Sequence, residues 1–149
     1  MTTTHTPTDA RTATLTDGTL AEDLAAKLVR FLETNTPPEG LFADDLFTDF
    51  TMPLWRLQAD TRDGGVQLRR DGHPGNGRVP RTRLDETSTG FLLEVEEEWE
   101  DQGETWYCRE LMRCDVTDGV VSQISVYCTG DWDEATVARH ADAVHLLRP

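Results

Sequence analysis

The segment GFLLEVEEEWEDQGETWYCRELMRCDVTDGVVSQISVYCTG, residues 90–130, contains the strongest periodic pattern in the chain. Apolar and polar side chains alternate along three stretches of it, and a period of two residues is typical of β-strands with one buried face. Turn residues interrupt the alternation at Gln102-Gly103 and at Thr117-Asp118-Gly119. The segment therefore predicts three antiparallel strands joined by two tight turns.

The length of the first turn sets the register of the first two strands. A two-residue turn at Gln102-Gly103 predicts five inward-facing pairs, namely Trp99 with Trp106, Glu97 with Cys108, Val95 with Glu110, Leu93 with Met112, and Phe91 with Cys114. The apolar side chains then share one face of the sheet. Two acids, Glu97 and Glu110, lie on that face with them.

The second turn leaves two arrangements open. We expect a three-residue loop with glycine in the left-handed position, which pairs Cys108 with Cys128 and Glu110 with Val126. Tyr127 then lies on the charged outer face. A two-residue loop would instead point Tyr127 inward, opposite Glu110, where its hydroxyl could donate a hydrogen bond to an oxyanion.

The rest of the chain predicts helices around this sheet. Residues 1–18 are rich in threonine and predict a mobile tail, and residues 19–149 predict a single domain. The expected elements are a helix at 19–35 with a capping box at Thr19 and Glu22, a strand at 46–55, a helix at 60–70, a strand at 78–89, and a last helix that Asp131 and Glu134 cap and that ends near 144. This order predicts an α+β fold with helices on one face of an antiparallel sheet.

Composition excludes several classes of function. The formal net charge is -14, from 28 acids and 14 bases, and this field repels nucleic acid. We see no apolar run long enough to span a membrane and no signal peptide, so we expect a cytoplasmic protein. The three cysteines fall on the apolar face and predict buried, reduced thiols.

Three stretches carry a resemblance to a known superfamily. Residues 20–35 look like its first helix, LFADDLFTDFTMP (residues 41–53) is similar to its first strand, and DGVVSQISVYCTGD (residues 118–131) resembles its closing turn and strand. Together they resemble the nuclear transport factor 2-like superfamily, which includes SnoaL-like polyketide cyclases, ketosteroid isomerase and limonene epoxide hydrolase. The resemblance covers roughly residues 19–140. It implies a cone-shaped α+β barrel, in which a strongly bent antiparallel sheet holds helices in its concave face, and it implies a homodimer.

Glu110 is the leading catalytic candidate. A carboxyl group on an apolar sheet face loses hydration, which raises its pKa and suits it to general acid or base catalysis. Ketosteroid isomerase-like members have a pocket acid near this position, although Met112 is the stricter match. Their usual base precedes the proline that ends the first strand, and here that residue is Met52, which cannot accept a proton. Glu97 is the second candidate, coupled to Glu110, and Tyr127 is the third.

The remaining site predictions concern the walls of the pocket. The residues expected to contact substrate are Phe50, Met52, Trp55, His73, Leu93, Val95, Trp99, Trp106, Met112 and Ile124. Histidines and cysteines show no metal-ligand spacing, and dinucleotide and phosphate-loop motifs do not occur, so we predict neither a metal site nor a cofactor.

The sequence thus favours a cofactor-independent cyclase or isomerase of secondary metabolism that acts on an apolar, polyketide-like substrate. Two alternatives stay open. One is a protein of the same fold that binds a hydrophobic ligand or a partner without catalysis. The other is an epoxide hydrolase-like member, which would need an Asp-Arg-Asp arrangement that the sequence alone does not assemble.

Overall fold

The computed structural model describes residues 18–149, so residues 1–17 of the predicted tail and the side chain of Thr19 lie outside the described part. Gly18, which was predicted to belong to the tail, is the first residue of a helix. The helices are α1 (Gly18–Thr34), α2 (Arg62–Gly72) and α3 (Glu134–Ala143). The strands are β1 (Phe42–Thr51), β2 (Arg56–Ala59), β3 (Gly77–Glu86), β4 (Gly90–Asp101), β5 (Glu104–Thr117) and β6 (Val120–Cys128). They form one sheet in the order β2-β1-β6-β5-β4-β3.

The long β4–β5 hairpin confirms the predicted register. Trp99 pairs with Trp106 and Val95 with Glu110, and the other three predicted pairs are also present. Gln102 and Gly103 both have positive φ, 52° and 80°, as a two-residue turn of the mirror-image type requires. The alternation therefore places Glu97 and Glu110 on the buried face, as predicted.

The β5–β6 hairpin differs from the expected three-residue loop. Asp118 and Gly119, with φ of 52° and 80°, form a two-residue turn, and Thr117 pairs with Val120. A bulge at Ser122 then inserts one extra residue, which returns the side chains to their original faces. As a result Glu110 lies opposite Cys128, and the predicted pairing of Cys108 with Cys128 is wrong by one pleat.

One pair of strands is parallel, whereas the sequence predicted an antiparallel sheet throughout. β1 runs parallel to β6, with Thr48 beside Ile124 and Phe50 beside Val126. The predicted strand at 46–55 ends earlier, at Thr51, and the chain turns back through Pro53 into the short edge strand β2. The sheet is consequently mixed, although the α+β architecture is the one expected.

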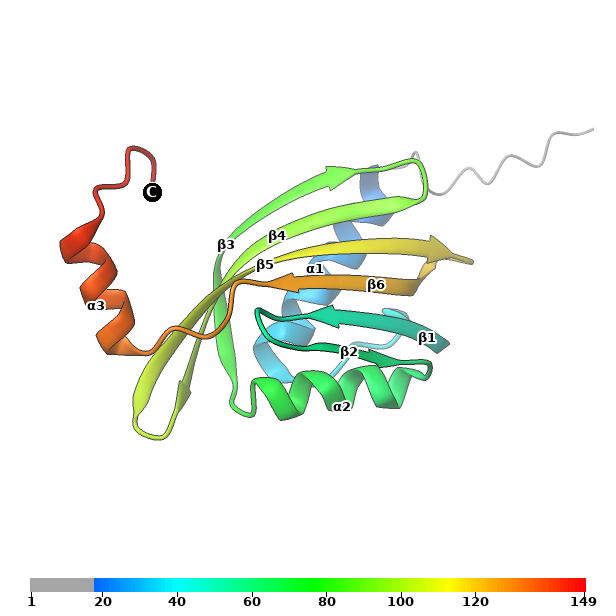
Figure 1. Ribbon diagram of the computed structural model, residues 1–149. Helices are drawn as coiled ribbons and strands as arrows, with labels where there is room; N and C mark the ends of the chain where they lie inside the picture. Colours follow the sequence, from blue (N-terminus) through cyan, green and yellow to red (C-terminus); the bar gives the residue numbers. More distant parts are fainter. Residues whose placement is uncertain (1–17) are drawn as a thin grey trace, which may run out of the picture.

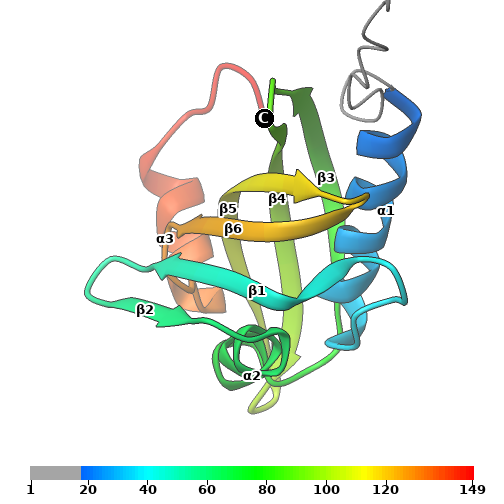
Figure 2. The same ribbon diagram turned by 90° about the vertical axis from the view of Figure 1, so that its right-hand side faces the viewer.

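The sheet bends strongly around α1 and α2, which both lie on its concave side (Figures 1 and 2). α1 packs against β3 and β4, and α2 packs against β1 and β2. The core lies between them and consists mainly of leucine, valine and phenylalanine side chains, among them Leu24, Leu28, Leu46, Phe91, Leu93 and Val121. No helix within residues 18–149 is long and apolar enough to cross a membrane.

The last helix, α3, does not lie in the cone. It stands beside the far end of the β4–β5 hairpin (Figure 1), where Trp132 forms an isolated bridge with Tyr107. Asp133 caps it by accepting a hydrogen bond from the backbone N–H of Thr136 at 2.8 Å. The predicted cap, Asp131, is therefore free for another contact, which is described below.

Candidate functional site

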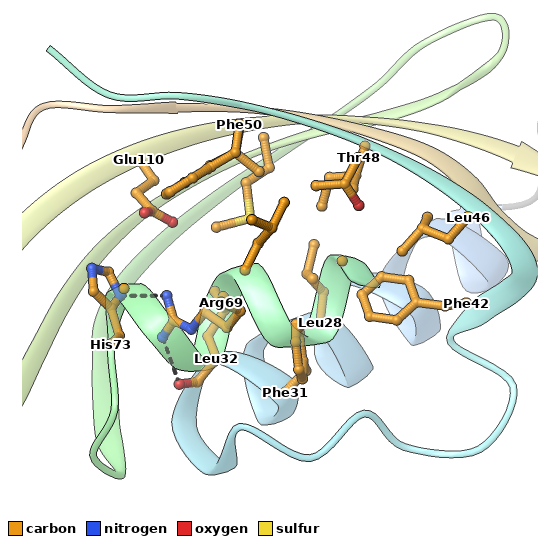
Figure 3. A pocket seen from close by; sticks show the side chains of 16 residues that line it. Leu28, Phe31, Leu32, Phe42, Leu46, Thr48, Phe50, Arg69, His73 and Glu110 are labelled. Atoms are coloured by element: carbon orange, nitrogen blue, oxygen red, sulfur yellow. Dashed lines mark hydrogen bonds between the residues drawn. The ribbon is translucent and has the colours of Figure 1, made fainter. Parts of the chain in front are cut away.

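A pocket opens between the concave face of the sheet and the two helices packed against it. It contains about 540 Å³ of space between protein atoms, part of which is continuous with solvent. Most of its walls are apolar and come from α1, β1, α2, β5 and β6 (Figure 3). The apolar side chains are Leu28, Phe31, Leu32, Phe42, Leu46, Phe50, Leu68, Met112, Ile124 and Val126. The polar ones are Thr48, Arg69, His73 and Glu110.

Glu110 projects into this pocket from β5. Its side chain is 3% exposed, and its Oε1 atom has no hydrogen-bond partner among residues 18–149. Val95 and Cys128 are its neighbours on the adjacent strands, and neither carries a charge that could pair with it. Glu110 therefore meets the conditions for a desolvated carboxyl group facing an apolar cavity.

Glu97 lies one pleat away on β4, and Arg69 of α2 neutralises it. Arg69 Nη1 donates to Glu97 Oε2 at 2.8 Å and to Oε1 at 3.2 Å. Arg69 also donates through Nη2 to the carbonyl oxygen of Leu32 at 2.8 Å and through Nε to Asn35 Oδ1 at 3.2 Å. One guanidinium thus ties α1, α2 and β4 together at the polar end of the pocket.

Asn35 holds the end of α2 in place. It follows α1 with a φ of 56°, a left-handed conformation that asparagine tolerates well. Its Nδ2 donates to the carbonyl oxygens of His73 at 2.6 Å and Gly75 at 3.0 Å. This fixes His73 at the C-terminal cap of α2, where its backbone N–H donates to the carbonyl oxygen of Arg69 at 2.9 Å.

The His73 ring contacts charged groups on both sides and stacks on Trp99 with ring centres 4.0 Å apart. Its Nε2 lies 3.2 Å from Asp131 Oδ1. Its Nδ1 lies 3.1 Å from Glu97 Oε2 and 2.6 Å from Arg69 Nη1. A neutral ring accepts from Arg69 at Nδ1, whereas a charged ring donates from Nδ1 to Glu97, so both protonation states have a partner.

The environment separates the pKa values of these groups. Burial alone would lower the pKa of His73, but its hydrogen bonds to Asp131 and Glu97 outweigh burial and raise the pKa to about 9. For Glu97 burial acts in the opposite direction and would raise the pKa. The hydrogen bonds and positive charges of His73 and Arg69 outweigh burial and hold the pKa of Glu97 below its ordinary value. Burial, followed by the charge of Glu97, raises the pKa of Glu110 well above its ordinary value. The pKa values of the two acids are therefore shifted in opposite directions, which is the arrangement of an acid and base pair.

These donors also form a cluster of metal-ligand type. The ligand atoms of His73, Glu97, Cys108 and Glu110 lie within 4.8 Å of one another. The Arg69 guanidinium already sits against both Glu97 and His73 and supplies the positive charge that a metal ion would bring. Arg69 therefore already supplies the positive charge that balances this cluster, and we assign it no metal ion.

Several of the residues predicted from the sequence meet in this site. Glu110, Phe50, His73, Met112 and Ile124 line the pocket, and Glu97 lies directly behind it.

Others lie elsewhere. Leu93 and Val95 are buried in the core without lining the pocket, and Trp99 contributes by stacking on His73. The predictions for Met52, Trp55, Trp106 and Tyr127 differ from the structure, because these side chains do not line the pocket.

Trp55 and Tyr127 lie outside the pocket for identifiable reasons. Tyr127 lies on the outer face, as the favoured register predicted, so the alternative in which it points toward Glu110 is wrong. Tyr127 pairs with Leu111 on the outer face and is 57% exposed, because the bulge at Ser122 compensates for the shorter turn. Trp55 is 67% exposed, because the chain leaves the inner face after Thr51 and turns toward β2.

The sequence interpretation missed Arg69, Asn35 and Asp131 as members of the site. Arg69 and His73 are four residues apart near the end of a predicted helix, a spacing that places side chains on one face. This four-residue spacing is the one local signal in the sequence that could have predicted the contact between Arg69 and His73. Asn35 and Asp131 approach from distant parts of the chain, 38 and 58 residues from His73.

No protein-family model and no curated protein sequence matches the chain. Solved structures do match. An NTF2-like protein from Anabaena variabilis has a TM-score of 0.66 and 14% identity, with 88% of this chain and 97% of that chain covered. An LEH-like epoxide hydrolase from M. tuberculosis has a TM-score of 0.56 and 14% identity, with coverage of 74% and 83%. A proposed polyketide cyclase from Xanthomonas campestris has a TM-score of 0.56 and 13% identity, with coverage of 73% and 90%.

At these identities the likeness concerns the fold, and proteins with one fold differ in chemistry. The mixed, bent sheet with α1 and α2 in its concavity is the architecture that these structures share with this chain. The chain therefore has the nuclear transport factor 2-like fold, the α+β cone also found in SnoaL-like and ketosteroid isomerase-like proteins.

Proposed function

We propose that this protein is a cofactor-independent enzyme that performs proton-transfer chemistry, a cyclisation or an isomerisation, on an apolar, oxygen-containing substrate of polyketide-like character. One observation carries the proposal. Glu110 is a buried carboxyl group with a raised pKa, and its unpartnered Oε1 atom faces an apolar pocket. Such a group donates a proton at neutral pH, where an ordinary glutamate has already lost it.

The neighbouring charges define the roles. Glu110 donates its proton to a substrate oxygen at which negative charge develops. The resulting carboxylate takes up the proton that a substrate carbon loses, so Glu110 is protonated again when the product forms. Glu97 stays ionised beside Arg69, and its charge keeps Glu110 protonated between turnovers. His73 connects the cluster to Asp131, whose side chain is 39% exposed, so protons can exchange with solvent along this path.

A second reaction is favoured by the pairing of the two acids. Their carboxyl oxygens lie within 4.8 Å of each other, and Arg69 stands beside Glu97. Epoxide opening needs one acid to protonate the epoxide oxygen and one carboxylate to activate water, roles that fit Glu110 and Glu97. The likeness to the LEH-like epoxide hydrolase supports this second candidate at the level of the fold.

The test compares wild type with Glu110→Gln on two probe reactions. The first is exchange of the α-hydrogens of 2-heptanone in deuterated water, followed by NMR. The second is hydrolysis of 1,2-epoxyheptane, followed by gas chromatography. We expect Glu110→Gln to slow the catalysed reaction by about 10²–10⁴-fold, the usual contribution of one general acid or base.

Glu96→Gln is the matched control, since Glu96 lies on the same hairpin but faces the outer side, where it accepts a hydrogen bond from the Tyr107 hydroxyl. Control activity should equal that of wild type. Full activity in Glu110→Gln, or no activity of the wild type on either probe while both bind, would shift the function to ligand binding without catalysis.

We further propose that the protein works in the cytoplasm as a homodimer. The free thiols of Cys108, Cys114 and Cys128 support a reducing compartment. The exposed pair of Leu111 and Tyr127 on the outer face of the sheet supports association through that face.

A further inference from the structure

Two buried side-chain atoms in residues 18–149 have no hydrogen-bond partner, and both belong to the same pocket. They are Glu110 Oε1 and Thr48 Oγ1. The two residues are 3% and 6% exposed. A buried polar atom without a partner costs about 1–3 kcal/mol, so a pair of them in one pocket points to an occupant that supplies the partners.

The surroundings of Thr48 show that its hydroxyl is closely enclosed. Thr48 lies on the inner face of β1, between Leu46 and Phe50, and beside Ile124 of β6. Gly65 of α2 approaches so closely that a Cβ atom there would lie 2.5 Å from Thr48 Oγ1. Valine has the same shape as threonine and would avoid the cost of the buried hydroxyl, which indicates that the hydroxyl has a use.

Glu110 and Thr48 lie apart along the pocket in Figure 3, with Phe50 between them and with Leu46 and Phe42 beyond Thr48. On β6, Glu110 is level with Cys128 and Thr48 is level with Ile124. Four residues along a strand span roughly 13 Å, and two strand spacings add roughly 10 Å across the sheet. The two backbone positions are therefore separated by roughly 16 Å, and because side chains on a concave face converge, the two polar atoms lie closer together than that.

We propose that the pocket binds an elongated, uncharged molecule with two oxygen functions, a carbonyl or similar acceptor at Glu110 and a hydroxyl or carbonyl at Thr48. The pocket wall between Glu110 and Thr48 is apolar and includes Phe50, Ile124 and Val126, so the middle of the ligand is hydrocarbon-like. This inference rests on the proposed function and adds the second anchor, which sets the length of the substrate. Thr48 is the specificity-determining residue in this arrangement.

The experiment uses two matched series of probes. One series is unbranched hydroxyketones, with four to ten methylene groups between carbonyl and hydroxyl. The other is the 2-alkanones of the same chain lengths. Affinities are measured by calorimetry for the wild type, Thr48→Val and Thr48→Ser. Valine removes the hydroxyl and keeps the shape, while serine keeps the hydroxyl.

We expect one length of hydroxyketone to bind the wild type about 3–10-fold more tightly than its alkanone, as one added hydrogen bond predicts. The gain should vanish in Thr48→Val and persist in Thr48→Ser, while alkanone affinity stays the same in Thr48→Val. Thermal unfolding of Thr48→Val, expected at or above the wild-type temperature, confirms that the variant is folded.

Three outcomes overturn the proposal: no gain at any length, a gain that survives in Thr48→Val, or no binding by any probe. If hydroxyketones bind no more tightly than alkanones at any length and Glu110→Gln still loses turnover, the proposed function stands and the second anchor alone is wrong. If the Thr48-dependent gain appears but Glu110→Gln is fully active, the anchor is correct and the catalytic role fails.

Discussion

Replacing Arg69 with methionine tests how the buried charges at the polar end of the pocket are held. Arg69 makes two hydrogen bonds to Glu97, which is 2% exposed, and further bonds to Leu32 and Asn35. Arg69→Met keeps most of the apolar contact of the side chain but leaves Glu97 buried beside His73 alone. Removing one partner of a buried ion pair costs up to about 3–5 kcal/mol when the other charge stays uncompensated. The expected loss lies below that limit, because His73 remains 3.1 Å from Glu97 as a charged partner.

The measurement is urea unfolding at pH 7 and fixed protein concentration, and it includes two comparisons. Arg70→Met is the matched control, since Arg70 is exposed and donates one hydrogen bond, to the carbonyl oxygen of Asn35 at 3.0 Å. We expect this control to cost about 1 kcal/mol or less. Adding Glu97→Gln to Arg69→Met should recover much of the lost stability, because no unpaired charge remains. A loss below about 1 kcal/mol in Arg69→Met, or no recovery in the double variant, would refute the reasoning.

Two further predictions concern pH and assembly. Because the pKa of His73 rises from 6.5 to about 9 on folding, its contribution to stability is full below pH 6.5 and is lost as pH rises through about 9. Between pH 6.5 and 9, the free energy of unfolding measured by chemical denaturation should therefore fall more for the wild type than for His73→Gln. If it falls equally for both proteins, the raised pKa of His73 is wrong. For assembly, sedimentation at micromolar concentration should show a dimer that Leu111→Arg converts to monomer, because this change places a charge on the exposed outer face. Sedimentation of the wild type as a monomer would contradict the proposed dimer.

Local patterns predicted the β4–β5 hairpin because the turn and the alternation are both short-range signals. Every inward pair from Phe91 to Trp106 follows from a two-residue turn and a period of two. The same logic failed at the next hairpin, because a bulge at Ser122 leaves no clear mark in the sequence and shifts the pairing of Glu110.

The parallel contact of β1 with β6 and most of the polar cluster were beyond local patterns. Nearly half of the chain separates β1 from β6, and their direction depends on how the sheet closes around the helices. The cation of the site is Arg69, which comes from helix α2 and pairs with Glu97. Arg69 and Asp131 reach His73 and Glu97 from separate elements, so only the assembled fold brings them together.

The central claim is that Glu110 stays protonated at neutral pH while Glu97 is ionised. Infrared difference spectroscopy between the wild type and Glu110→Gln detects the C=O stretch of a protonated carboxylic acid directly. The account predicts such a band in the wild type at pH 7, its absence in Glu110→Gln, and its retention in Glu96→Gln. A wild-type spectrum at pH 7 with only ionised carboxylate, identical to that of Glu110→Gln in the protonated-acid region, would contradict the account.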